Sequence, residues 1–252
     1  MNNTIRMYLI LTFLIMGICW GTCLVCSLFG IFLTAMPVLY IPFLIGGWSP
    51  TIAAFLVMRK TSCVSGFKDW LGKTFDWKQS LWKYAAAAVF AAIFFCCLCT
   101  VSGYSAGAPL FAVVFMIPPM LFMGGLEEVG WRGLLQPELE KRLGFTLATL
   151  VVSVIWWLWH LPLFYINGVA QYGADFLEFG INILGLSFAL AALKKATGST
   201  WLCVFLHCLV NSLHGVYVIA PGRRGSAVAA AALIVASYVF RLIENRAMRN
   251  SR

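Results

Sequence analysis

Charged residues are scarce in this chain of 252 residues. They make up 11% of the sequence, against 62% hydrophobic residues, and only nine of them are acidic. The mean hydropathy is +0.89, whereas a typical soluble domain has about 25% charged residues. The composition therefore excludes a soluble globular protein and predicts an integral membrane protein.

Long polar connections are also missing, which leaves no room for a separate soluble domain. A helix crosses about 30 Å of hydrocarbon with about 20 apolar residues, and eight stretches suit this task. They lie at residues 7–28, 33–58, 82–103, 109–127, 144–164, 176–193, 201–219 and 226–243. We therefore predict an all-α, polytopic membrane protein with eight transmembrane helices and one membrane domain over residues 1–252.

Basic residues are distributed unevenly over the predicted connections. With eight spans both termini face one side, and that side would hold 16 of the 18 lysines and arginines, leaving Arg223 and Arg224 opposite. Because cytoplasmic connections carry an excess of Lys and Arg, we predict a multi-pass protein of the cell membrane with both termini in the cytoplasm. The net charge of +9 then indicates attraction to anionic membrane lipids, and no motif suggests nucleic acid as a partner.

Polar residues inside the apolar runs are few, so each one calls for an explanation. Ionisable side chains in a membrane are costly and usually mark a functional site. On a helix, positions i and i+4 share a face, whereas neighbouring positions are about 100° apart. Glu128 is therefore expected to pair with Arg132 at the membrane edge, which leaves Glu127 without a local partner and free to act on water.

Only three histidines occur in the chain, and all lie in or at the end of predicted spans. His207 and Asn211 project from one face of the seventh span, and His160 lies on the fifth. Together with Glu127, these side chains are suited to polarising water and stabilising an oxyanion. For each histidine or asparagine alone, an interhelical hydrogen bond is the alternative. For the two glutamates, the alternative is that both are ordinary helix-end charges among the lipid headgroups. His214, about 10 Å further along its helix, is interpreted as peripheral.

Three short motifs carry these residues, in order, on successive predicted helices: "EEVGWR" from Glu127, "WWLWH" ending at His160 and "HCLVN" from His207. They fit the patterns Glu-Glu-x-x-x-Arg, aromatic-x-x-x-His and His-x-x-x-Asn. In this order they resemble the CAAX protease and bacteriocin-processing family (CPBP, or Abi) of intramembrane endopeptidases, which includes the type II CAAX prenyl endopeptidases. The resemblance places the catalytic core at residues 124–214. Trp156 stands where phenylalanine is more usual, and we interpret it as an aromatic wall of the site.

The resemblance implies roles for the motif residues. Glu127 matches the glutamate that activates water with help from His160, while His207 and Asn211 match the residues that hold the oxyanion of the tetrahedral intermediate. Glu128 and Arg132 match a supporting pair, in agreement with the argument from helix faces.

The implied activity is hydrolysis of a peptide bond, and the implied partner is a membrane-associated peptide or lipidated C-terminal motif. Family members process prenylated C-terminal motifs in eukaryotes. In bacteria they are linked to peptide maturation, bacteriocin immunity or signalling. Nothing in this sequence selects among these pathways.

The residues leave two mechanisms open. Glu127, His160 and His207 would satisfy a catalytic zinc shell of two histidines and one glutamate, with water as the fourth ligand. Asparagine is a poor zinc ligand but a good oxyanion donor, however, and the sequence has no HExxH pair. We therefore favour a metal-free mechanism without a cofactor, as the resemblance also implies, and keep zinc as the alternative.

Two other functions also remain open. Buried glutamate and histidine can mark the ion pathway of a proton-coupled transporter, although no internal repeat is apparent. A membrane protein that serves bacteriocin immunity or binding without catalysis could keep the same fold.

The predicted spans contain one geometric conflict. A fourth span that ends at 127 places Glu127 near the cytoplasmic side, whereas His160, 16 residues into the fifth span, would lie about 24 Å from that side. Either the fifth helix begins in the cytoplasm and protrudes, or the fourth is kinked at Pro118 and Pro119 so that Glu127 lies deeper.

Overall fold

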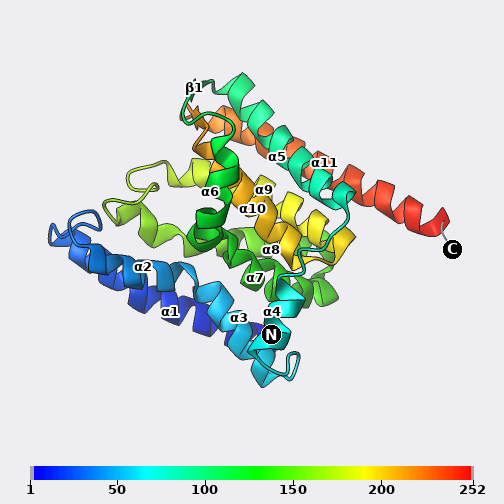
Figure 1. Ribbon diagram of the computed structural model, residues 1–252, viewed down its shortest axis with the longest axis horizontal. Coiled ribbons are helices and arrows are strands. Elements are labelled where there is room, and N and C mark those ends of the chain that lie inside the picture. Colours follow the sequence, from blue (N-terminus) through cyan, green and yellow to red (C-terminus); the bar gives the residue numbers. More distant parts are fainter. Residues whose placement is uncertain (1–2, 251–252) are drawn as a thin grey trace.

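The computed structural model describes residues 3–250, which are almost entirely helical (Figure 1). The α-helices are α1 (Asn3–Leu28), α2 (Tyr40–Gly47), α3 (Ser49–Lys60), α4 (Phe67–Thr74), α5 (Leu81–Val101), α6 (Ala112–Met120), α7 (Glu127–Gly130), α8 (Gln136–Trp159), α9 (Phe176–Thr197), α10 (Thr200–His214) and α11 (Arg223–Asn250). The 3-10 helices are η1 (Pro37–Leu39) and η4 (Leu161–Tyr165), and the π-helices are η2 (Leu121–Gly125) and η3 (Trp131–Leu135). Two short antiparallel strands, β1 (Tyr104–Ala106) and β2 (Tyr217–Ile219), form the one departure from an all-α fold within the described residues.

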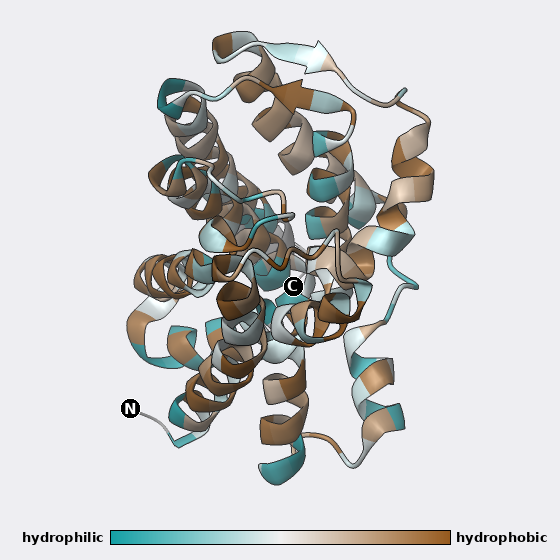
Figure 2. Cartoon of the chain, turned by 90° about the vertical axis from the view of Figure 1, so that its left-hand side faces the viewer, coloured by the Kyte–Doolittle hydropathy of each residue, from teal (hydrophilic) through white to brown (hydrophobic). Residues whose placement is uncertain are grey.

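Apolar helices make this a multi-pass membrane protein. In residues 3–250, five helical stretches are long and apolar enough to cross a membrane, and a sixth arises if the pair Pro37–Gly47 and Ser49–Lys60, bent by 47°, counts as one span. Two further apolar helices, Ala112–Gly125 and Thr200–His214, are shorter. Figure 2 shows hydrophobic residues along most of the helices. Length and composition thus support five or six spans, and they do not confirm eight.

The longest of these stretches, Glu127–Tyr165, is folded back on itself. The backbone leaves the helical conformation at Gly144, whose φ of 70° lies in the left-handed region that favours glycine. Beyond this turn the chain runs back toward Glu127. Trp156 Nε1 donates to a carboxylate oxygen of Glu127 at 2.8 Å. In a straight helix, residues 29 positions apart would be about 43 Å from each other. The stretch is therefore a pair of antiparallel helices.

The first limb of this pair continues the path of α6. Met116 approaches Gly215 at the end of α10, and Gly133 approaches Thr200 at its beginning, so the path from α6 to the turn runs antiparallel to α10. Glu127 therefore lies in the middle of a long, interrupted helical segment. The helical path thus continues beyond residue 127, where the fourth span was predicted to end.

Two local features explain the interruption. Pro118 and Pro119 lie inside α6, where they remove two backbone donors from the helix. Met123 and Gly124 then leave the helical conformation within η2. The helix is interrupted as the second explanation predicted, but the break lies at Met123 and Gly124, about one turn beyond the two prolines. Oε2 of Glu127 lies 3.9 Å from Nε2 of His160, so the two residues are at the same level. The cytoplasmic start of the fifth helix stays a prediction.

The core is centred on α9. Its residues from 187 to 193 are all buried, and it packs against α8, α10 and α11, while α11 also lies along α5 (Figure 1). A Cβ atom at Gly185 would lie 2.6 Å from Cα of Ala230, so α9 and α11 are in close backbone contact. Such contact between small residues is the usual way in which membrane helices associate. It gives the site a rigid wall.

Candidate active site

A cavity of about 670 Å³ opens between the helices. Its wall is mostly apolar and aromatic, and all four residues predicted to be catalytic line it. Its polar side chains include Glu127, His160, Gln171, Asn182, His207, Asn211 and His214. The structure thus brings together residues that lie up to 84 positions apart in the sequence.

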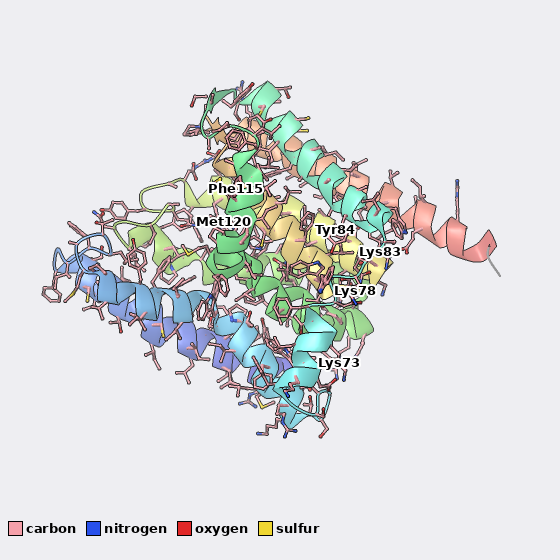
Figure 3. All side chains as sticks on the ribbon, viewed as in Figure 1. Lys73, Lys78, Lys83, Tyr84, Phe115 and Met120 are labelled. Carbon is pink, nitrogen blue, oxygen red and sulfur yellow. The ribbon has the colours of Figure 1, made fainter. Side chains whose placement is uncertain are left out.

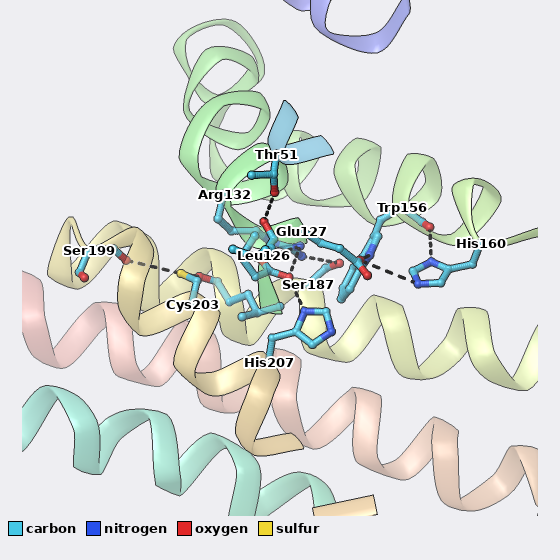
Figure 4. A network of polar contacts seen from close by, with 12 residues as sticks. Thr51, Leu126, Glu127, Arg132, Trp156, His160, Ser187, Ser199, Cys203 and His207 are labelled. Atoms are coloured by element: carbon cyan, nitrogen blue, oxygen red, sulfur yellow. Dashed lines mark hydrogen bonds and ion pairs between the residues drawn. The ribbon is translucent and has the colours of Figure 1, made fainter. Parts of the chain in front are cut away.

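The break before α7 is held by neighbouring side chains. The carbonyl of Phe122 accepts a hydrogen bond from Trp48 Nε1 at 2.8 Å. The carbonyl of Leu126 accepts one from the hydroxyl of Thr51 on α3 (Figure 4). Side chains that satisfy irregular backbone of this kind stabilise it inside an apolar environment. Glu127, the next residue, is thereby fixed in place.

The Glu127 carboxylate points toward the second limb of the helix pair. One oxygen, Oε2, accepts from Trp156 Nε1 at 2.8 Å and lies 3.9 Å from Nε2 of His160 (Figure 4). Glu127 is only 7% exposed. The interpretation of Trp156 as a wall was incomplete, because the indole also donates a hydrogen bond that phenylalanine lacks.

The tautomer of His160 follows from its backbone contact. Nδ1 lies 2.8 Å from the carbonyl of Trp156, and because a carbonyl only accepts, Nδ1 carries a proton. In a neutral ring Nε2 is then an acceptor. This nitrogen and the Glu127 carboxylate face each other as two acceptors that are too far apart for a direct hydrogen bond. A water molecule has the two donors that such a pair requires.

His207 and Asn211 lie one turn apart on α10, as their spacing predicted. A Cβ atom at Gly124 would lie 2.9 Å from Nε2 of His207 and 2.6 Å from Nδ2 of Asn211. The two nitrogen atoms therefore converge on the space left by this glycine. Gly124 was not among the predicted site residues, and the only signal for it in the sequence is the glycine pair before the glutamates.

Glu128 and Arg132 form the predicted ion pair, at 3.1 Å. Both side chains are fully buried within the protein, and their position at the membrane edge stays a prediction. Arg132 also donates to the hydroxyl of Ser187 at 3.0 Å, and its guanidinium lies 4.6 Å from the centre of the Trp156 ring. Glu128 in turn lies 2.9 Å from Nδ1 of His207. The pair therefore supports the site from within the core.

The positions of possible metal ligands can be compared with the zinc alternative. Among residues 3–250, no three His, Cys, Asp or Glu side chains are grouped so as to hold a metal ion. Glu127, His160 and His207 consequently do not form the shell that this alternative requires. The absence of a metal from the mechanism stays a prediction.

His214 also lines the cavity, seven residues beyond His207. Its ring lies 4.9 Å from that of Phe95 in an edge contact. No hydrogen bond joins it to the motif residues in the described part of the chain. Its peripheral role stays a prediction.

Comparison with known proteins identifies the region that holds these motifs. Residues 109–213 match the family model described as type II CAAX prenyl endopeptidase Rce1-like. This region is an Rce1-like domain. For this region, the family predicted from the three motifs is confirmed.

A curated relative of the Rce1-like domain supports this assignment. CAAX prenyl protease 2 of Methanococcus maripaludis is 30% identical over 120 residues, which cover 43% of this chain and 42% of the relative. The match thus spans less than half of the length of each protein.

Proposed function

We propose that this protein is an intramembrane endopeptidase that hydrolyses a peptide bond with water activated by Glu127. One observation carries the proposal: the carboxylate of Glu127 and the acceptor nitrogen of His160 face each other across 3.9 Å at a cavity of peptide-binding size. A water molecule between them donates one hydrogen to each. General-base assistance of this kind accelerates a reaction by about 10² to 10⁴ fold.

The chemical steps follow from these contacts. Glu127 accepts a proton from water while the oxygen attacks the scissile carbonyl, and the carbonyl electron pair moves onto its oxygen. The tetrahedral oxyanion then collapses, the C–N bond breaks, and Glu127 returns the proton to the leaving nitrogen. Trp156 Nε1 orients the carboxylate through its hydrogen bond.

The two nitrogen atoms that converge on the space beside Gly124 stabilise the oxyanion. Asn211 donates from Nδ2. His207 donates from Nε2, and because its Nδ1–H is directed to the Glu128 carboxylate, the ring has to be doubly protonated to do so. Glu128 and Arg132 make this possible, since two carboxylates in the site then balance one guanidinium and one imidazolium. Buried charges are tolerated only in such balanced groups.

The substrate we propose is a peptide with a prenylated C-terminal motif. The name of the relative, CAAX prenyl protease 2, supports this class, and so does the mostly apolar cavity wall. Membrane lipids surround the protein, and the cell membrane is the proposed location.

We further propose the eight-span topology with cytoplasmic termini. In this proposal, five spans are single helices: α1, α5, the second limb of α8, α9 and α11. The sixth is the bent pair of α2 and α3, and the seventh is the path from α6 to Gly144. The eighth is the short helix α10. With 15 residues α10 is shorter than a full span of about 20, and a bilayer accommodates a short helix by thinning locally.

Hydrolysis in water enriched in ¹⁸O tests the proposed function. The purified protein in liposomes is incubated with a synthetic farnesylated CAAX-type peptide, and the products are analysed by mass spectrometry. We expect a truncated peptide that carries one ¹⁸O in its new carboxylate. Binding of this peptide without cleavage would instead favour the non-catalytic alternative, and proton flux without cleavage would favour the transporter.

A further inference from the structure

One side chain of the cavity wall has no role in the chemistry described above. The helix α9 lines the cavity with Phe179, Asn182, Ile183, Leu186 and Leu190. Asn182 is the polar member of this set. Asparagine is a poor residue for a helix interior, and an amide is costly in an apolar environment.

The Asn182 amide is unpartnered. Its Oδ1 atom is buried without a hydrogen-bond partner, and neither amide atom takes part in a hydrogen bond with any of residues 3–250. A buried acceptor left unpaired destabilises the fold. Native structures retain few such groups, and those that they do retain require an explanation. Binding of a ligand in the cavity would supply the missing partner.

Asn182 lines the same cavity as the reacting groups, on a helix that is firmly packed. The ring of Phe179, one turn earlier on α9, packs 4.9 Å from the ring of His160. Elsewhere on α9, Gly185 is in backbone contact with α11 and Ser187 accepts a hydrogen bond from Arg132. The amide is therefore presented by a rigid element, as specific binding requires.

We propose that Asn182 binds the backbone of the substrate peptide. Its Oδ1 accepts the N–H and its Nδ2 donates to the C=O of an extended segment beside the scissile bond. A carboxamide presents an acceptor and a donor side by side, which is the complement of a peptide backbone. The contact is independent of the peptide's side chains, so it holds the chain in register without selecting its sequence. This inference rests on the proposed function and adds a substrate-binding residue to it.

A backbone contact is tested by removing its partner from the peptide. The probes are farnesylated CAAX-type peptides in each of which one backbone N–H is replaced by an ester oxygen. For the wild type, we expect the ester at one position to lower kcat/KM by about fivefold to tenfold, as loss of one hydrogen bond does. In Asn182→Leu, whose side chain has the same branching but no polar atom, the same ester should change kcat/KM by less than about twofold.

Two control variants make the test specific. Leu186→Ala removes an apolar group from the same wall, and we expect it to stay as sensitive to the ester as the wild type. Asn182→Ala repeats the test in case leucine disturbs the packing of α9. Wild-type-like sensitivity to the ester at every position in both Asn182 variants would overturn the proposal and leave the endopeptidase assignment intact.

Binding provides a readout that does not depend on cleavage. The same ester series is measured as Kd by fluorescence anisotropy of labelled peptides in the Glu127→Gln background. Ester sensitivity that disappears with the Asn182 side chain supports the inference even if the wild type cleaves none of these peptides. Equal Kd values for amide and ester peptides in the Asn182-containing protein, or no binding by folded protein, would refute it.

Discussion

Replacement of Arg132 by alanine should lower the unfolding temperature of the protein substantially, because it leaves the buried carboxylate of Glu128 without its ion-pair partner. Glu128 and Arg132 are both fully buried and lie 3.1 Å apart. Removing one partner of such a pair costs about 3–5 kcal/mol. In a protein of this size each kcal/mol shifts Tm by about 2–4 °C, so we expect Arg132→Ala to lower Tm by about 6–20 °C.

The assay is thermal unfolding of purified variants in one detergent. Glu128→Ala should give a similar loss, since it leaves the guanidinium unpaired, and both variants should also lose cleavage activity. Arg142→Ala is the matched control, because Arg142 is exposed and surface changes stay within about 0.5 kcal/mol. Glu127→Ala should abolish cleavage with little loss of folded protein. Equal, fold-neutral losses of activity in the Glu127, Glu128 and Arg132 variants would refute the reasoning.

Three further predictions concern the oxyanion, the topology and the outer surface. His207→Ala and Asn211→Ala should each lower turnover by about 10² to 10³ fold with nearly unchanged peptide binding. If instead only the histidine variant is inactive and a chelator reversibly inactivates the wild type, zinc ligation is correct. A thiol introduced at Lys73, which lies on α4 (Figure 3), should resist an impermeant reagent added to sealed cells, and labelling from outside would overturn the topology. A hydrogen bond from Arg223, at 2.7 Å, lowers the pKa of Asp175. Because the folded-state pKa lies below the unfolded value of about 3.9, the stabilisation is present above about pH 4 and is lost as the pH falls through the folded-state pKa. Asp175→Asn, which keeps an acceptor for the N-terminus of α9, should therefore lower Tm at pH 6 and not at pH 2, and equal shifts at both values would contradict this.

Local geometry was predictable from the sequence. The pairing of Glu128 with Arg132 follows from helical spacing alone, and so does the shared face of His207 and Asn211. The predicted apolar stretches coincide with apolar helical segments of the chain because burial in lipid demands continuous hydrophobic runs.

Features that depend on contacts between helices were not predictable. The position of Glu127 in the middle of its segment depends on the break at Gly124 and the turn at Gly144. A hydropathy profile does not reveal either one. The hydrogen bond from Trp156 joins residues 29 positions apart, so the motif alone suggested a passive aromatic ring. The unpaired amide of Asn182 likewise appears only once α9 is packed against the cavity.

The central claim is that Glu127 activates the hydrolytic water, and the kinetics of Glu127→Gln test it most directly. Glutamine has the same shape and keeps an acceptor for Trp156 Nε1, but it does not accept a proton from water. With the farnesylated CAAX-type peptide in liposomes, the account predicts that cleavage falls by at least about 10² fold, while Tm and the Kd of the peptide stay close to the wild-type values. Cleavage within about tenfold of the wild type by the folded Glu127→Gln protein would contradict the account.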